Sequence, residues 1–331
     1  MIQNVPIKEI YATGNAHPIK ATLGPGLTIS ALHVQSGMAI SLGSTYAPVV
    51  DGKTALEPFM IMRPSQYIGV LERSYEPEAE ISDAVILGSV KNYYHFVVAQ
   101  LPALALLAGR PDPVRLATTP MLGTFDAWMP KLLTAFSRAR PVELMPIKHH
   151  AAYSVRNVLF PTAQLPNVAA HICKHLLLPM FLHAAGVGDL MRELGPLKLF
   201  VVRRGATDAR NLINHAEVQD WYVRRGYQPI NPGEMTLDQQ AITFARATHI
   251  VGLEGGAMTN IAFAVNAQKV LMWASPMVAD EKFFPDIAQY YDYEFLQSFG
   301  IVETRGGAAY RDSNYTISLD SLHAQHATGG W

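Results

Sequence analysis

The segment from Thr248 to Trp273 (THIVGLEGGAMTNIAFAVNAQKVLMW) constrains the fold of this chain more than any other. A short run of β-branched and apolar residues ends at Gly252, Ala257–Ala264 has helical composition, and Lys269–Trp273 is a second apolar run. A strand, a glycine-rich turn, a helix and a second strand in this order make one unit of a parallel sheet. The segment therefore predicts an α/β fold.

The turn of this unit carries three glycines, Gly252, Gly255 and Gly256, and one acid, Glu254. Such a turn lets the backbone approach a ligand closely and points the first N–H groups of the next helix at it, which suits a phosphate. Many turns of this kind only pack a helix on a strand, so the loop alone leaves both interpretations open. The spacing lacks the G-x-G-x-x-G pattern of dinucleotide-binding proteins, and we do not expect a nicotinamide enzyme.

The second half of the chain predicts a doubly wound β-α-β-α-β-α-β domain. Asn214 with Glu217, and Thr236 with Gln239, have capping-box form and predict the starts of two of its helices. A strand at Tyr227–Ile230 lies between these helices. Ligands of such domains bind at the carboxyl ends of the strands, and we expect the functional site there.

Arginines follow one of these strand ends. Arg203 and Arg204 come directly after the predicted strand Lys198–Val202, Arg210 follows shortly after, and the Glu254 turn leaves another strand. Arginine side chains and helix-end amides are the usual groups that hold a diphosphate. Arginine pairs after a strand are often only solvated, but together with the glycine-rich turn they predict a diphosphate site.

In the first half, residues 91–109 predict a mostly apolar and buried helix that is kinked or restarted near Pro102 and ends at Gly109. Polar groups in a buried helix need partners. Asn92 and His95 share one helical face and are predicted to point together into a cleft. The alternative is an ordinary core histidine with a satisfied hydrogen bond.

The length of 331 residues fits two domains. A glycine-rich stretch that ends at Gly195-Pro196 marks the border between them. We expect an α/β domain over residues 1–190, a Rossmann-like domain over residues 191–300 and a C-terminal extension over residues 301–331.

Only 16% of the residues are charged and the formal net charge is −1, so neither nucleic acid nor an acidic membrane surface is an expected partner. The single cysteine, Cys173, cannot form an internal disulfide, and the longest apolar stretch, Phe96–Ala108, is too short to span a bilayer. We expect a cytoplasmic protein, with peripheral contact to the inner face of the cell membrane left open. His171 and His175 flank Cys173, but further ligands at zinc spacing are missing, and no metal or cofactor is predicted.

Five sequence blocks carry a resemblance to a known family. They are N-Y-Y-H-F…L-P (Asn92–Phe96, Leu101, Pro102), V-R-R-G (Val202–Gly205), L-I-N-H-A-E-V (Leu212–Val218), N-P-G-E-M-T-L-D-Q-Q (Asn231–Gln240) and G-A-M-T-N (Gly256–Asn260). In their order and spacing, residues 91–300 resemble the bacterial capsular-polysaccharide-type glycosyltransferases of family 61.

The resemblance implies a GT-B fold, in which two Rossmann-like doubly wound domains face each other across a cleft. It implies an acceptor-side domain at 1–190, a nucleotide-sugar-binding domain at 191–300, and inverting, metal-independent transfer. The donor would be a nucleotide-diphosphate sugar with UDP as the nucleotide, and the acceptor a hydroxyl of a glycan or lipid-linked saccharide in surface polysaccharide synthesis.

Two positions depart from the family pattern. The loop usually reads G-x-H-G, and here Glu254 occupies the histidine position. An acid often precedes the L-P pair, where this chain has Ala99 and Gln100. These departures leave a second interpretation open, a catalytically inactive member that binds a nucleotide sugar or a glycan. A nucleotide-sugar epimerase of related fold is a third, although it does not share the sequence blocks.

The resemblance and the residue patterns together give the predicted site. His95 and Glu254 are the candidates for the catalytic base, and Glu254 is equally a candidate ligand of the nucleotide's ribose hydroxyls. Asn92 and Tyr94 are expected on the acceptor side. The predicted donor and diphosphate ligands are Arg203, Arg204, Arg210, Asn211, Gly255, Gly256, Ala257, Met258, Thr259 and Asn260.

Overall fold

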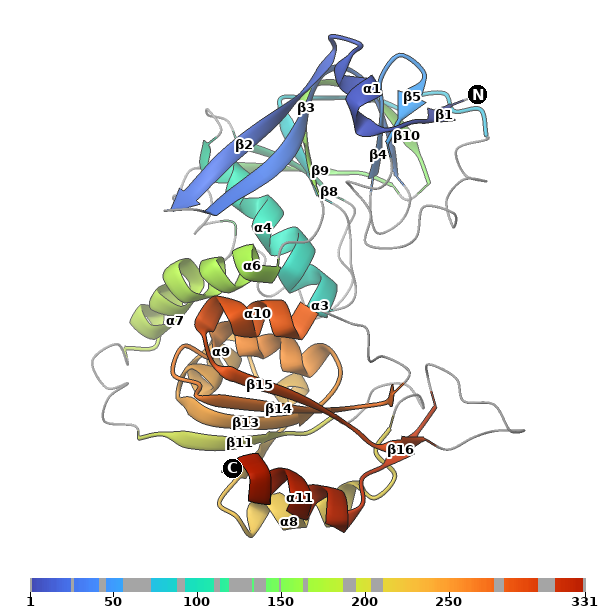
Figure 1. Ribbon diagram of the computed structural model, residues 1–331. Coiled ribbons are helices and arrows are strands. Elements are labelled where there is room, and N and C mark those ends of the chain that lie inside the picture. Colours follow the sequence, from blue (N-terminus) through green and yellow to red (C-terminus); the bar gives the residue numbers. More distant parts are fainter. Residues whose placement is uncertain are drawn as a thin grey trace. The chain divides into compact units, whose positions relative to one another are not determined.

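A computed structural model gives the structure of the chain (Figure 1). It describes residues 2–24, 27–41, 46–55, 73–87, 93–109, 114–118, 133, 141–148, 150–162, 166–186, 195–203, 211–276, 283–302 and 313–329. The chain forms two compact units, Met1–Ala169 and Ala170–Trp331. Both contain helices and parallel strand pairs, so the predicted α/β class is confirmed.

The first unit is built on a mixed sheet whose strands lie in the order β2-β3-β10-β7-β8-β9. Neighbours are antiparallel from β2 to β10 and parallel from β10 to β9, whereas the resemblance implies a doubly wound sheet. Two more strands, β4 and β6, pair with β3 and β10. The bounds are β2 Ala16–Gly24, β3 Leu27–Ser41, β4 Tyr46–Val49, β6 Glu80–Ser82, β7 Ala84–Leu87, β8 Val114–Thr118, β9 Val142–Pro146 and β10 Ala152–Pro161.

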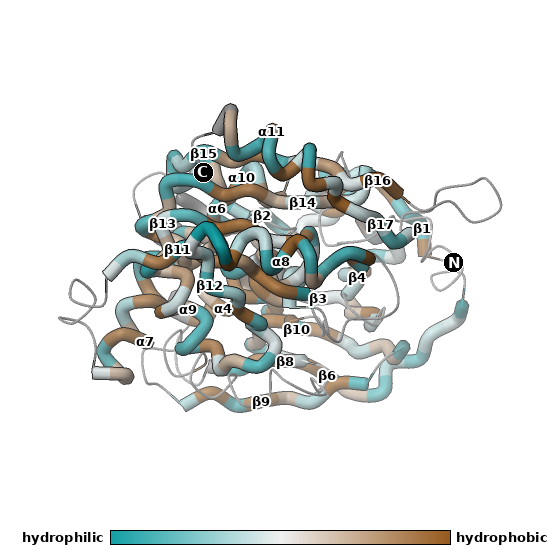
Figure 2. The backbone as a smooth tube through the Cα atoms, turned by 90° about the horizontal axis from the view of Figure 1, so that it is seen from below, coloured by the Kyte–Doolittle hydropathy of each residue, from teal (hydrophilic) through white to brown (hydrophobic). Residues whose placement is uncertain are grey.

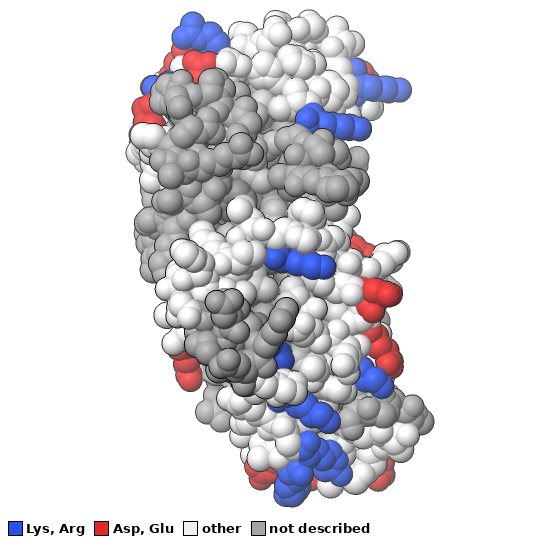
Figure 3. Space-filling view, turned by 90° about the vertical axis from the view of Figure 1, so that its left-hand side faces the viewer, with Lys and Arg blue, Asp and Glu red and all other residues white. Residues whose placement is uncertain are grey.

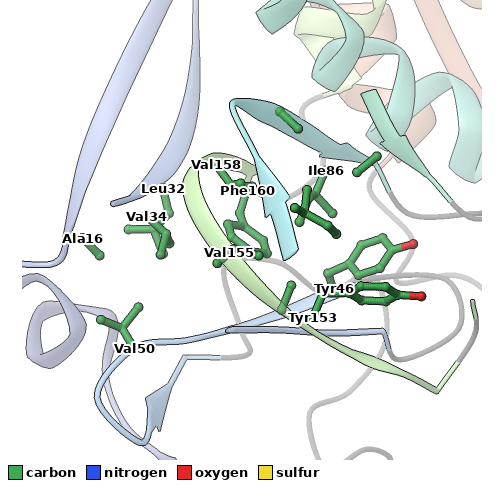
Figure 4. Packing of buried hydrophobic residues seen from close by; sticks show 14 of the residues in the cluster. Ala16, Leu32, Val34, Tyr46, Val50, Ile86, Tyr153, Val155, Val158 and Phe160 are labelled. Carbon is green, nitrogen blue, oxygen red and sulfur yellow. The ribbon is translucent and has the colours of Figure 1, made fainter. Parts of the chain in front are cut away.

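The core of this unit lies along β3 and β10 (Figure 4). Leu32 and Val34 of β3 pack with Val158 and Phe160 of β10, and all four are buried. A short parallel pair of β1 (Gln3–Asn4) and β5 (Lys53–Thr54), with helix α1 (Ile7–Tyr11), adds the buried Ile10.

β3 is a single long strand. It runs without a break over Leu27–Ser41. Gly37 does not break it, because a Cβ at this position would overlap the Val49 carbonyl of β4. The glycine therefore permits a close approach of two strands.

The predicted helix at 91–109 is helical over its described part and ends at Gly109. It runs as α3 (Tyr93–His95), the π-helical turn η3 (Phe96–Gln100), α4 (Leu101–Leu104) and the 3₁₀ turn η4 (Ala105–Gly109). Proline lacks an N–H and its ring crowds the carbonyl four residues earlier, so a wider turn before Pro102 relieves the clash. The expected irregularity near Pro102 is therefore this π turn.

The same arrangement recurs further along the chain. There, α6 (Pro166–Ile172) passes through a π turn, η5 (Cys173–Leu177), into α7 (Leu178–Ala184), whose second residue is Pro179. Both π turns come directly before a Leu-Pro pair. Proline therefore accounts for the widening in both helices.

The second unit is built on a parallel sheet in the order β12-β11-β13-β14-β15. Helices α8 and α11 cover one face, and α9 and α10 cover the other (Figure 1). Apolar and hydrophilic residues alternate along α8 and α11, as helices on a sheet surface require (Figure 2). The bounds are β11 Leu197–Val201, α8 His215–Val223, β12 Gln228–Ile230, η7 Pro232–Glu234, α9 Leu237–Ala245, β13 Ala247–Leu253, η8 Gly256–Phe263, β14 Lys269–Ala274, α10 Phe283–Tyr291, β15 Glu294–Phe299, β16 Ile301–Val302, β17 Tyr315–Thr316 and α11 Leu319–Gly329.

Of the two predicted capping boxes, one is confirmed. Thr236 accepts from the Gln239 N–H at 3.4 Å and the Gln239 side chain accepts from the Thr236 N–H at 2.9 Å. Asn214 makes no such cap. Its Nδ2 instead donates to the Ile317 carbonyl at 2.8 Å, so it ties the start of α8 to the C-terminal segment.

That segment is part of the fold of the second unit. Tyr315, Ile317 and Leu322 are buried in the core beneath α8 and α11. Among the residues that the structure describes, no helix is long and apolar enough to cross a membrane.

Candidate functional site

The strand order of the second unit shows where a ligand crevice can form at the edge of its sheet. The connection after β11 leads to β12 on one side, and the later strands continue on the other side of β11. Loops that leave the carboxyl ends of β11 and β13 therefore diverge, and ligands of open α/β sheets bind at such a switch point. The residues that follow these two strands are Arg203 and Glu254.

These two residues are in contact. Arg203 donates from Nη1 to the Glu254 carbonyl at 3.0 Å. The Glu254 N–H in turn donates to the Trp273 carbonyl of β14 at 2.7 Å. The side chain of Glu254 is buried, with 6% of the residue exposed. An arginine, a buried acid and the end of a third strand thus meet at the predicted edge.

Gly255 has a conformation that other residues rarely adopt. Its φ is 150° and its ψ is −179°, a region occupied almost only by glycine. A Cβ at this position would lie 3.4 Å from Arg203 Nη1. Such a distance is an ordinary van der Waals contact, so Gly255 is needed for the direction of the loop rather than for room beside Arg203.

The helix after this loop differs from the prediction. An α-helix was expected over Ala257–Ala264, but η8 is a 3₁₀-helix over Gly256–Phe263. Its first bond runs from the Met258 N–H to the Gly255 carbonyl at 3.0 Å. The N–H groups of Gly256 and Ala257 thus precede the first helical bond, and no carbonyl among the described residues accepts from them. These amides, with that of Gly255, are the donors that the loop presents, whereas the Met258 amide is used inside the helix.

The last three predicted residues of the loop are buried. Met258 fills the space beside Gly252, where a Cβ would overlap its sulfur. Asn260 donates from Nδ2 to Gln240 Oε1 at 2.9 Å and to the Ala257 carbonyl at 3.0 Å. Thr259, like the other two, has no exposed surface. Gly255, Gly256 and Ala257 are partly exposed, so the first half of the loop faces outward and the second half holds it in place.

Sequence reasoning missed the segment that supports Asn211. The Asn211 N–H donates to Asn314 Oδ1 at 2.9 Å, and its carbonyl accepts from the Tyr315 N–H at 3.1 Å. Tyr315 also donates from Oη to the Trp273 carbonyl at 3.4 Å, the group that receives the Glu254 N–H. Residues 313–317 therefore support both loops, and we call them the strap. The alternation of buried Tyr315 and Ile317 was the available signal.

A family model confirms the resemblance. The model of Glycosyltransferase 61 matches residues 93–271, more than half of the chain. The chain belongs to the Glycosyltransferase 61 family. None of the curated proteins matches the sequence. The matched region of this glycosyltransferase begins at α3 and ends within β14, so it contains Arg203 and the Glu254 loop and leaves out the strap.

Other predicted residues of the glycosyltransferase lie in the first unit or outside the described residues. Tyr94 and His95 belong to α3, and their rings lie 5.1 Å apart with an edge-on contact. Tyr94 is 9% exposed. Asn92, Arg204 and Arg210 lie outside the described residues.

The histidines considered for a metal have another partner. The His171 and His175 rings are 4.5 Å apart, and His171 Nδ1 lies 3.0 Å from Tyr290 Oη. Burial raises the pKa of the Cys173 thiol between them. Within the described parts of the chain, no group of three or more His, Cys, Asp or Glu side chains is arranged to hold a metal ion.

Proposed function

We propose that this glycosyltransferase moves a sugar from a nucleotide-diphosphate sugar, with UDP as the nucleotide, to a hydroxyl of a glycan or lipid-linked saccharide in surface polysaccharide synthesis. The proposed transfer is inverting and metal-independent, within a GT-B arrangement of two domains. The proposed enzyme works in the cytoplasm or at the inner face of the membrane. The observation that carries the proposal is the meeting of Arg203 with the loop Glu254–Ala257 at the switch point of a parallel sheet.

The proposed donor site follows from charge. A diphosphate needs fixed hydrogen-bond donors, and helix-end amides with arginine are the usual ones. The amides of Gly255, Gly256 and Ala257 and the guanidinium of Arg203 would bind it. Met258, Thr259 and Asn260 would contribute by holding the loop, since their side chains are buried.

The proposed reaction is a single displacement. A base takes the proton of the acceptor hydroxyl as its oxygen attacks the anomeric carbon of the donor. The bond from that carbon to the diphosphate breaks, and the nucleoside diphosphate leaves with the electron pair. Preorganised donors lower the barrier most where this negative charge develops, which assigns Arg203 and the loop amides to the leaving group.

His95 and Glu254 remain the two candidates for the base, with Asn92 and Tyr94 on the acceptor side. Glu254 has a second possible role, because a buried carboxylate at the end of a strand also suits the ribose hydroxyls of a nucleotide. Single-turnover transfer by H95Q and E254Q separates the roles. Loss of the base lowers the rate at saturating donor, whereas loss of a ribose contact weakens mainly donor affinity.

A thermal-shift panel with UDP, GDP, CMP and dTDP, each with and without Mg²⁺, tests the donor site. A ligand that binds only the folded protein raises its apparent stability. We expect UDP to stabilise the wild type equally in both conditions, and R203A to lose the shift. Absence of a shift with every nucleotide on folded protein contradicts the proposal, and a shift that needs Mg²⁺ contradicts its metal independence.

A further inference from the structure

The amino edge of the second unit's sheet carries a row of basic side chains. Lys198 of β11 is in register with His249 of β13, which is in register with Lys269 of β14. Partners in register on parallel strands project to the same face, about 4.8 Å apart. The three side chains therefore stand side by side at the edge opposite to the carboxyl ends. We call them the Lys198 row.

The two lysines of the row differ in their neighbours: one faces a carboxylate and the other an aromatic ring. Glu294, the next residue in register, lies 3.4 Å from Lys269 Nζ. Lys198 has no carboxylate within 4.0 Å among the described residues, and its ammonium group lies over the Tyr227 ring, 5.4 Å from the centroid. Figure 3 shows several Lys and Arg side chains in the lower part of the picture, with Asp and Glu side chains at its margins. Like charges side by side on a sheet destabilise it, so the row retains an unfavourable arrangement.

The pKa of His249 reflects its burial and the charges around it. Partial burial lowers its pKa first, and the ammonium groups of Lys198 and Lys269 lower it further. Its Nδ1 lies 3.2 Å from the Thr248 hydroxyl, which itself donates to the Leu197 carbonyl. Nδ1 is therefore the donor in this contact, and Nε2 carries a proton only when the imidazole is charged.

We propose that the Lys198 row binds a phosphate group. One phosphate above His249 would place its oxygens within reach of both ammonium groups, and lysine suits phosphate as a point charge. The imidazolium Nε2–H would add a third donor. This site is separate from the proposed donor site, which lies at the opposite edge. Its ligand is the phosphate of a soluble ester or of a lipid headgroup.

Histidine NMR tests the site directly. The C2–H resonance of His249, assigned by its loss in H249N, gives the pKa of this residue. Salt alone raises this pKa by screening the two lysines, so inorganic phosphate is compared with chloride at equal ionic strength. We expect phosphate to raise the pKa more than chloride does. An equal rise with both salts, or no rise, overturns the proposal.

Two variants locate the binding. K198Q and K269Q are each expected to weaken phosphate affinity about two- to fivefold, the factor of one exposed ion pair. K8Q, which changes an exposed lysine of α1 in the first unit, is the matched control and leaves the affinity unchanged. Equal affinity in K198Q, K269Q and wild type places the phosphate elsewhere and overturns the proposal.

Vesicles distinguish the two sources of phosphate. A lipid headgroup is the ligand if the protein sediments with phosphatidylglycerol vesicles but not with phosphatidylcholine vesicles, and if K198Q weakens this sedimentation. Phosphate binding at His249 without sedimentation identifies a soluble phosphate ester. Both outcomes support the site, and neither depends on the nucleotide panel.

Discussion

The two edges of the second unit's sheet present basic groups by different means. At the carboxyl edge, the backbone diverges at the switch point, and one arginine meets a loop whose first residues, Gly255–Ala257, are partly exposed. At the amino edge, Lys198, His249 and Lys269 stand in register on neighbouring strands, and the charge lies on side chains. Fixed amide dipoles need no reorganisation, whereas exposed ammonium groups are screened by salt. The comparison predicts specific, salt-tolerant binding at the first edge and weaker, salt-sensitive binding at the second.

Replacing Gly255 with alanine should have the largest effect. Its backbone conformation costs a residue with a Cβ about 1–3 kcal/mol. We expect the loop to change direction, the UDP-induced thermal shift to disappear and the transfer rate to fall about 10²-fold. A thermal-shift assay measures the effect of UDP on stability, and initial rates measure the transfer.

Gly226, at the amino edge, is the matched control. Its φ is 83°, and a Cβ there would meet no atom within 4 Å. G226A should destabilise the protein by about 1 kcal/mol or more, as any Cβ in this region does, and leave the UDP shift intact. Equal loss of the UDP shift in both variants would show that the effect of G255A is general destabilisation.

Arg203 comes next. R203K keeps the charge but loses the planar guanidinium that reaches the Glu254 carbonyl. We expect UDP affinity to fall about tenfold, near the value of one hydrogen bond to a charged group. Isothermal titration measures it. R225K is the control, because Arg225 bonds to the Trp221 carbonyl and stacks on its ring near the amino edge. A smaller effect for R203K than for R225K would remove Arg203 from the site.

Much of the carboxyl edge could be predicted from sequence because its signals are local. Buried parallel strands read as short apolar runs, and β13 and β14 were found in this way. The 3₁₀ form of η8 could not be predicted. It depends on the packing of Met258 beside Gly252 of β13 and on the bond from Asn260 to Gln240 of α9, and these tertiary contacts leave no local sequence pattern.

In the first unit, tertiary contacts limit prediction from the sequence even more. Its long antiparallel pairing joins Ala152 to Ile40 and continues to Pro161 with Ala31. No local sequence pattern identifies a partner strand more than 100 residues away, because such pairings are set by tertiary packing. The close approach of β4 to β3 at Gly37 is another contact that no local sequence pattern shows.

The strap offers a prediction of intermediate size. N314A removes the oxygen that accepts from the Asn211 N–H. We expect a loss of about 1 kcal/mol in stability, the value of one hydrogen bond, and a several-fold loss in UDP affinity, because Asn211 is one of the proposed donor ligands. Urea unfolding and titration measure the two effects. N266A is the control, since its side chain bonds to the Ala245 carbonyl near the amino edge. Unchanged UDP affinity in N314A would limit the strap to a role in stability.

The smallest expected effect concerns pH at the amino edge. The pKa of His249 is lowered from its ordinary value of 6.5 by burial and by the two lysines, so the folded state disfavours the imidazolium. Well above pH 6.5, His249 is neutral in both the folded and the unfolded state, and its lowered pKa does not reduce the free energy of unfolding. As the pH falls from there through the folded pKa, the unfolded chain takes up the proton first and stability is lost.

H249N should therefore lose less stability than the wild type over this pH range, as measured by urea unfolding at several pH values. The pKa of His175 is also lowered, by burial and by Lys174. H175N therefore serves as a control for the contribution of His175 to the pH dependence of stability. Phosphate that occupies the Lys198 row would raise the His249 pKa and flatten the same profile in the wild type but not in K198Q. A profile that phosphate leaves unchanged would separate the titration of His249 from anion binding, and the difference between the two edges would then rest on the carboxyl edge alone.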